Sequence, residues 1–237
     1  MKKQLTFILL SLLSITLFSQ IEYGYERPKS STDPWKFGIT GGVSWDWINQ
    51  QNGIQKKIGW RAGISGEKHL VYNIYFRPAL NFVKKGFLCD IENNFKNDVN
   101  AYLVQAELNF ELKFGNEYKG RGFLCYFAPF FSYGIGGKST LTNQNPINPG
   151  NPNLPPENYM VPIEYSTFYE DRDKLKNLSF AKEDVGFILG VGYDINHNIE
   201  LNFNYTLGFI NIGAYNNFRW QNLNFSLTYF FSNGKRR

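Results

Sequence analysis

After its first twenty residues, the sequence lacks any apolar run long enough for a transmembrane helix, and its mean hydropathy is −0.36. Such a helix needs about 20 mostly apolar residues, so these features exclude a protein with several membrane-spanning helices. They do not exclude a membrane β-barrel, because half of every barrel strand is polar.

Cysteine and excess charge are also scarce. Cys89 and Cys125 are the only cysteines, too few for a disulfide framework. We expect both to be unpaired, Cys89 in a polar loop and Cys125 in a strand. The formal net charge of +5 falls to +3 without Lys2 and Lys3, and no basic stripe is present. The sequence therefore predicts no nucleic-acid partner.

The first residues have the features of an export signal. Lys2 and Lys3 precede an apolar run that ends at Phe18, and Ser19 offers a small residue for cleavage. The run is short for a membrane anchor. We predict a cleaved signal peptide at residues 1–19 and an extended periplasmic lead-in at residues 20–35.

A period of two runs through residues 101–114. Every second residue is apolar, namely Tyr102, Val104, Ala106, Leu108, Phe110, Leu112 and Phe114. The residues between them are mostly polar or charged, which indicates a strand with one apolar and one polar face. Its length suits a strand tilted across a bilayer, which needs about 9–11 residues. A long strand of a soluble sandwich or ligand-binding barrel would show the same pattern.

The same alternation recurs and predicts an all-β, eight-stranded, antiparallel up-and-down transmembrane β-barrel over residues 36–231. The predicted strands are residues 36–46, 57–66, 71–83, 101–114, 123–136, 184–195, 199–210 and 218–231. Connections after even-numbered strands are short, and those after the first, third and fifth tend to be long, as in outer-membrane barrels. We expect a polar loop at residues 84–100, a long extracellular loop at about residues 138–180, and a tail at residues 232–237.

The interior of an eight-stranded barrel is about wide enough for its own side chains. The predicted inward positions carry charged residues that form a lumen polar network, namely Arg61, Arg77, Glu107, Glu111, Lys113, Asp194 and Glu200. Opposite charges in so narrow a space should pair, because an unpaired buried charge is costly. An ion path or a ligand site is one interpretation; a filled, structural polar core is the one we favour.

Three pieces of the chain resemble a known family. They are residues 102–108 together with 128–130, residues 190–194, and residues 227–231. These pieces look like the outer-membrane β-barrel family (porin family or PorT-like) of Bacteroidota-type bacteria, over residues 36–231. The resemblance implies an eight-stranded barrel whose function is mostly unassigned, although one member serves protein secretion. It also implies that the barrel-insertion machinery reads the closing aromatic strand, which residues 232–237 extend.

Histidine is too rare to support an enzyme. His69 and His197 are the only two, and both fall in predicted short connections, on the rim away from the outer leaflet. A hydrolase or a metal site would need His with Ser, Asp, Glu or Cys close by. We therefore predict no catalytic residue, no metal site and no cofactor.

The combined interpretation is a non-enzymatic protein of the Gram-negative outer membrane with a structural or surface-recognition role. Outer-membrane lipid and the barrel-insertion machinery are the expected partners, together with an extracellular or secretion-system protein. Four aromatic residues of the long loop are candidate surface contacts, namely Tyr159, Tyr165, Phe168 and Tyr169. The same aromatic residues could instead fold down as a lid on the barrel mouth. The alternatives are a narrow porin-like diffusion channel, an accessory barrel of a secretion system, and a periplasmic lipocalin-like binding barrel.

Overall fold

The structure is a computed structural model that describes residues 34–49, 53–91, 95–116, 121–143, 162–168, 180–213 and 218–231. Its strands are β1 (Lys36–Ile48), β2 (Ile54–Val71), β3 (Ile74–Ile91), β4 (Phe95–Asn116), β5 (Arg121–Gly136), β6 (Lys138–Asn143), β7 (Ile163–Ser166), β8 (Glu183–Asp194), β9 (Ile199–Gly208) and β10 (Trp220–Phe230). The described residues contain no helix long and apolar enough to cross a membrane. The predicted signal peptide, nearly all of the lead-in, and the C-terminal tail lie outside the described residues.

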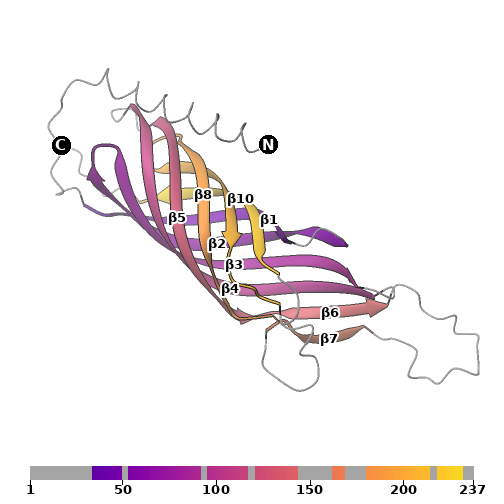
Figure 1. Cartoon of the computed structure of the whole chain (residues 1–237). Helices are drawn as coiled ribbons and strands as arrows, with labels where there is room; N and C mark the ends of the chain where they lie inside the picture. Colours follow the sequence, from indigo (N-terminus) through magenta and orange to yellow (C-terminus); the bar gives the residue numbers. More distant parts are fainter. Residues whose placement is uncertain are drawn as a thin grey trace, which may run out of the picture. The chain divides into compact units, whose positions relative to one another are not determined.

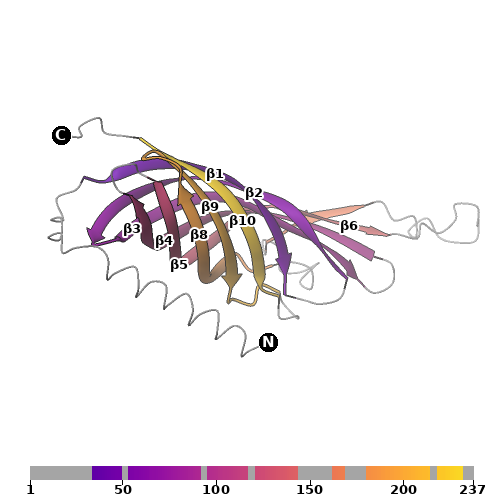
Figure 2. The ribbon, with the colours of Figure 1, turned by 90° about the horizontal axis from the view of Figure 1, so that it is seen from above.

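Eight of the strands close into a ring. Each strand pairs antiparallel with its neighbour in the order β1, β2, β3, β4, β5, β8, β9, β10, and β10 pairs back onto β1. Figures 1 and 2 show these strands curving around a common interior. The predicted eight-stranded up-and-down barrel is confirmed. Closure leaves the ring without a free edge, which removes the aggregation hazard of such apolar ribbons.

The strands are tilted in the ring. Starting at Gly41 of β1, the hydrogen-bonded register reaches Tyr133 of β5 by way of β2, β3 and β4. In the opposite direction, through β10, β9 and β8, it reaches Phe123 of the same strand, which lies 10 residues away. A stagger of this kind requires the strands of a closed barrel to lean by about 35–45° from its axis.

The period of two separates a lipid face from a lumen face. On β4, Leu108 is 47% exposed, whereas its neighbours Glu107 and Asn109 are 4% and 2% exposed. The same alternation holds on β1, β5, β8, β9 and β10. The sequence therefore predicted correctly which residues of these strands point outward.

Aromatic side chains gather at both ends of the lipid face. Near the short turns they include Trp35, Phe37, Phe123, Tyr193, Tyr229 and Phe231; near the long connections they include Trp45, Trp60, Tyr102, Tyr133 and Phe209. Two aromatic girdles that flank an apolar band about 25 Å tall are the mark of a barrel seated in a bilayer. We call the second group the upper girdle.

The predicted polar loop at residues 84–100 is wrong. β3 and β4 pair without interruption from Ile74 opposite Leu112 to Ile91 opposite Phe95, so most of this segment is a hairpin that rises beyond the ring. It was missed because inward Phe87 and Val99 alternate there with outward Lys84, Asp98 and glycine, a pattern with too few apolar residues to indicate a strand.

The predicted loop at about residues 138–180 is partly wrong as well. Residues 138–143 form β6, which pairs with the raised part of β4, and residues 163–166 form β7, which pairs with β6. Both strands extend the raised hairpin beyond the ring, as Figures 1 and 2 show. The proline-rich residues 144–161 between them lie outside the described residues.

Candidate functional site

The lumen near the short turns is organised around Lys113 of β4. Its Nζ lies 2.5 Å from Glu67, 3.1 Å from Glu200, 3.4 Å from Asp194 and 3.7 Å from Glu111. These carboxylates come from β2, β9, β8 and β4, so one ammonium group joins four strands. A buried charge with several close partners is satisfied, whereas a single distant partner would not offset its desolvation.

Arg77 of β3 forms the next level of the lumen. Its Nε lies 2.6 Å from Glu111 Oε1, and its Nη1 forms a close ion pair with Glu200. The guanidinium also lies 5.7 Å from the ring of Tyr126. The planar fork of arginine suits this role, because it can serve two carboxylates in fixed directions.

A third level lies deeper along the axis. Arg61 Nη2 donates to Glu107 Oε1 at 2.6 Å, and the Gln105 amide donates to the same oxygen at 2.7 Å. On the facing wall, Asn204 Nδ2 donates to the Tyr126 hydroxyl at 2.8 Å, and Asn224 donates to Asn204 Oδ1 at 2.8 Å. Polar side chains of β2, β4, β5, β9 and β10 thus fill the cross-section.

The seven residues predicted for the lumen polar network all face the interior, and each takes part in at least one ion pair. Four further charged residues of the lumen were missed, namely Asp46, Glu67, Lys85 and Asp184. Glu67 and Lys85 were missed because strands two and three were drawn too short. Asp46 and Asp184 were missed because each stands at the end of a predicted strand, although each continues the inward alternation, Asp184 with Gly186 and Ile188.

Lys85, Asp46 and Asp184 form the level beneath the barrel mouth. Lys85 is 1% exposed, its Nζ lies 4.0 Å from Asp184 Oδ2, and its Nζ lies 5.4 Å from the Phe130 ring centre and 6.0 Å from that of Trp220. The lysine is therefore held between a carboxylate and two aromatic faces, which attract a cation.

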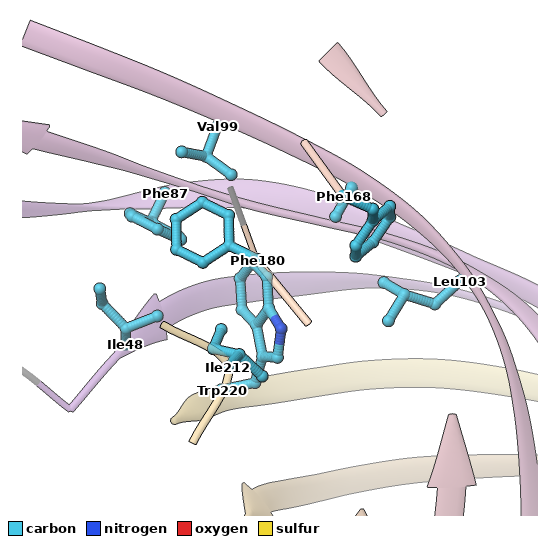
Figure 3. Packing of buried hydrophobic residues seen from close by; sticks show 9 residues of the cluster. Ile48, Phe87, Val99, Leu103, Phe168, Phe180, Ile212 and Trp220 are labelled. Atoms are coloured by element: carbon cyan, nitrogen blue, oxygen red, sulfur yellow. The ribbon is translucent and has the colours of Figure 1, made fainter. Parts of the chain in front are cut away.

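An apolar cap closes the lumen above Lys85. Its buried residues are Ile48, Phe87, Val99, Ala101, Leu103, Phe168, Phe180, Ile212 and Trp220. Figure 3 shows this cluster, with the labelled side chains converging on one another. Phe87 stacks edge-on against Phe180 at 5.6 Å and Trp220 at 5.4 Å. The cap joins β1, β3, β4 and β10 to three residues outside the strands, namely Phe168 after β7, Phe180 before β8 and Ile212 after β9.

Hydrogen bonds hold these three segments in place. Phe180 N donates to Thr167 O at 2.9 Å, and Ala181 N donates to Ile212 O at 2.8 Å. The Thr167 hydroxyl donates to Asn100 O at 2.7 Å. The backbone of the cap is thus tied to β4 and to the chain after β9.

Phe168 is not a surface contact. It is 2% exposed and belongs to the cap, because its ring lies over the bare backbone of Gly134. This placement corrects the prediction for Phe168 and agrees with the lid interpretation for that residue. Tyr165 lies in β7, where its hydroxyl donates to Asn97 Oδ1 at 2.7 Å, and burial raises the pKa of Tyr165 to about 12. Tyr159 and Tyr169 lie outside the described residues.

The lumen contains a small cavity lined by polar side chains. This cavity of about 20 Å³ lies beside Arg61, Arg77 and Tyr126, about the space that one water molecule occupies. The carboxylates of Glu67, Glu111 and Glu200 lie within 4.8 Å of one another, as in a metal site. Lys113 and Arg77 form ion pairs with these three carboxylates. Their side-chain cations therefore occupy the position that a metal ion would need.

The histidines are not grouped for catalysis in the described residues. His69 lies near the end of β2 rather than in a turn, with its Nε2 2.5 Å from Tyr72 O, because β2 continues to Val71. His197 lies in the turn between β8 and β9, as predicted. Cys89 and Cys125 are both free, and Cys89 lies in β3 rather than in a loop.

A closed antiparallel ring with an apolar, aromatic-edged outer face and a charged interior defines a transmembrane β-barrel protein. Residues 7–231 match the sequence profile of the outer membrane protein beta-barrel domain family. The chain belongs to that family and is a protein of the Gram-negative outer membrane.

Several solved structures are similar in fold. Neisserial surface protein A has 12% identity and a TM-score of 0.43, over 87% of this chain and 100% of that one. Ail of Yersinia pestis has 10% identity and a TM-score of 0.43, over 84% and 100%. OprG of Pseudomonas aeruginosa has 10% identity and a TM-score of 0.34, over 83% and 94%. None of the curated proteins matches the chain.

Proposed function

We propose that this protein is a non-enzymatic outer-membrane barrel with a sealed lumen, which acts as a structural or surface-recognition protein. The observation that carries the proposal is the succession of filled levels along the barrel axis. Ion pairs around Lys113, Arg77 and Arg61 occupy three levels, and the apolar cap closes the mouth above Lys85. A hydrated ion would have to break buried ion pairs and an apolar seal to pass.

The proposed orientation puts the short turns in the periplasm and the raised hairpin outside the cell. The ring begins at β1 and ends at β10 on the same rim, where Phe231 N donates to Phe37 O at 2.7 Å. An even number of strands puts both ends on one side, and short turns are periplasmic in bacterial barrels. The raised hairpin with β6 and β7 would then be the part that meets other molecules.

The filled lumen weighs against the alternative of a narrow diffusion channel. The PorT-like resemblance and a role beside a secretion system remain predictions, because they rest on strand patterning alone. Partners at the cell surface and the barrel-insertion machinery likewise remain part of the proposal. In this proposal, specificity belongs to the raised hairpin and the proline-rich segment next to β6, not to the barrel interior.

Planar-bilayer recording of the purified full chain tests the sealed lumen. We expect no stable steps in the nanosiemens range. The matched comparison is Phe180→Ala, which removes a central ring of the cap, recorded beside Phe37→Ala on the lipid face. Reproducible large openings of the unmodified protein would contradict the proposal and support the channel.

A further inference from the structure

The lipid face of β2, β3 and β4 carries a lysine at the level of the upper girdle. Lys84 is paired in register with Trp60 on one side and Tyr102 on the other, and it follows Leu80 and Phe82 on the outward face of β3. Phe82 contacts both of these aromatic residues, with its ring centre 5.6 Å from that of Trp60 and 6.1 Å from that of Tyr102. Lys84 thus lies between Trp60 and Tyr102 and next to Phe82 on the lipid face.

A second lysine lies at the mouth of the barrel. Lys56 of β2 is exposed, and its Nζ lies 4.6 Å from the centre of the Trp47 ring on β1. We call the surface formed by Lys56, Lys84, Trp47, Trp60 and Tyr102 the basic wall. Aromatic rings with lysines beside them are the arrangement that settles at a headgroup region, where the ring body is apolar and the ammonium is wet.

The two lysines differ from their neighbours in the ion pairs that the described residues form. Lys57 is paired with Asp98 and donates to Asn100 Oδ1 at 2.8 Å. Higher on the hairpin, Asp90 lies opposite Lys96 in the register. Among the described residues, no carboxylate forms an ion pair with Lys56 or Lys84. Their positive charge therefore remains available at the membrane surface.

The rim near the short turns carries one lysine of each kind. Lys36 lies 3.4 Å from Glu67, which also binds Lys113. Lys68 lies 5.8 Å from the Trp35 ring centre, which makes it a lysine on an aromatic residue like Lys56, at the opposite girdle. It is therefore a matched control for a charge at the other membrane surface.

We propose that the basic wall binds the phosphate groups of an outer-leaflet lipid, with Lys56 and Lys84 as the binding cations and Trp47, Trp60 and Tyr102 against the adjoining lipid. The outer-leaflet assignment rests on the orientation given under the proposed function. We infer a lipid as the ligand because the two lysines lie next to lipid-facing aromatic rings. A soluble anion would make no favourable contact with those rings.

Native mass spectrometry of the full chain from detergent micelles measures this binding directly. The probes are diphosphoryl lipid A, monophosphoryl lipid A, and diphosphoryl lipid A in the presence of excess inorganic phosphate. A cation near an anionic lipid surface contributes about 1 kcal/mol, which is about a fivefold change in affinity. Lys56→Gln and Lys84→Gln should each lower the affinity for diphosphoryl lipid A by about fivefold. The double variant should lower this affinity by about 25-fold.

Three outcomes overturn the proposal. In the first, the double variant binds diphosphoryl lipid A as tightly as the unmodified protein does. In the second, Lys68→Gln lowers the affinity for lipid A as much as Lys56→Gln or Lys84→Gln does. In the third, excess inorganic phosphate displaces the bound lipid A, which would make the surface a site for free anions. The proposal is supported if the unmodified protein retains diphosphoryl lipid A better than monophosphoryl lipid A and the lysine variants do not. A heat-modifiable band on gels shows that each variant is folded.

Binding in micelles depends on neither the orientation nor the conductance of the barrel. A failure here leaves the sealed-lumen proposal standing, and an inverted topology would move this lipid site to the inner leaflet without removing it.

Discussion

Arg77 on β3 and Glu200 on β9 form an ion pair across the lumen, although their strands stand four places apart in the ring of eight. Arg77 also forms an ion pair with Glu111 on β4, and Glu200 forms one with Lys113. The pair therefore braces opposite walls of the barrel from within. Its members are almost wholly shielded from solvent, so removal of one leaves the other uncompensated.

Arg77→Met should destabilise the barrel by about 3–5 kcal/mol, because it leaves Glu111 and Glu200 buried without their main cation. Urea unfolding in lipid vesicles, followed by tryptophan fluorescence, gives the free energy of unfolding. The control is Lys138→Met, which breaks the exposed Lys138–Glu164 pair at 3.3 Å and should cost about 0–1 kcal/mol.

Adding Glu111→Gln and Glu200→Gln to Arg77→Met should restore part of the lost stability, because no unpaired carboxylate then remains at that level. If Arg77→Met costs no more than Lys138→Met, the brace across the lumen does not stabilise the fold as we infer.

Leu108→Arg should cost about 2–4 kcal/mol, because Leu108 lies on the lipid face between the two girdles. Leu112→Arg is the matched control. It lies on the same face of the same strand but close to the rim, where the cost should be about 0–1 kcal/mol. Unfolding in vesicles measures both. Equal costs would mean that the bilayer does not lie between the girdles where we place it.

Gly134→Ala should disturb the cap, because a Cβ at Gly134 would overlap the ring of Phe168, which cannot move outward through the packed cluster. Overpacking of this kind costs about 1–3 kcal/mol. Gly136→Ala is the control, since nothing lies within 4 Å of its added Cβ. Unfolding free energies and chymotrypsin cleavage at the cap compare the two. Identical behaviour would show that Phe168 does not rest on Gly134.

Protease added to intact cells should cut between β6 and β7, within residues 144–161, and leave the strands of the ring whole. The expectation follows from the proposed orientation, since this segment joins the two strands that extend the raised hairpin. The control site is the short turn at residues 195–198, which should be cut only after the outer membrane is breached. Protection of residues 144–161 in intact cells would mean that the topology is inverted.

The sequence by itself determined which residues face lipid and which face the lumen. Side chains alternate along any extended strand, so the runs around Leu108, Phe225 and Leu189 define their faces without knowledge of their partners. It also determined the number of ring strands, because turn residues separate the apolar alternations. Apolar alternation failed where it was weak, at the end of β2 after Gly66, in the hairpin at residues 84–100, and in β6 and β7.

The tertiary structure alone decided which charges meet and what closes the mouth. The cross-lumen pair of Arg77 and Glu200 depends on the stagger of the closed ring, which no local pattern encodes. Phe87 is far from Phe168 and Phe180 in the chain, and it lies in a segment of quite different composition. An aromatic residue in a long polar loop is equally compatible with an exposed contact and with a lid over the barrel mouth. Only the apolar surface left open at the barrel mouth, which those rings cover, makes Phe168 part of the cap.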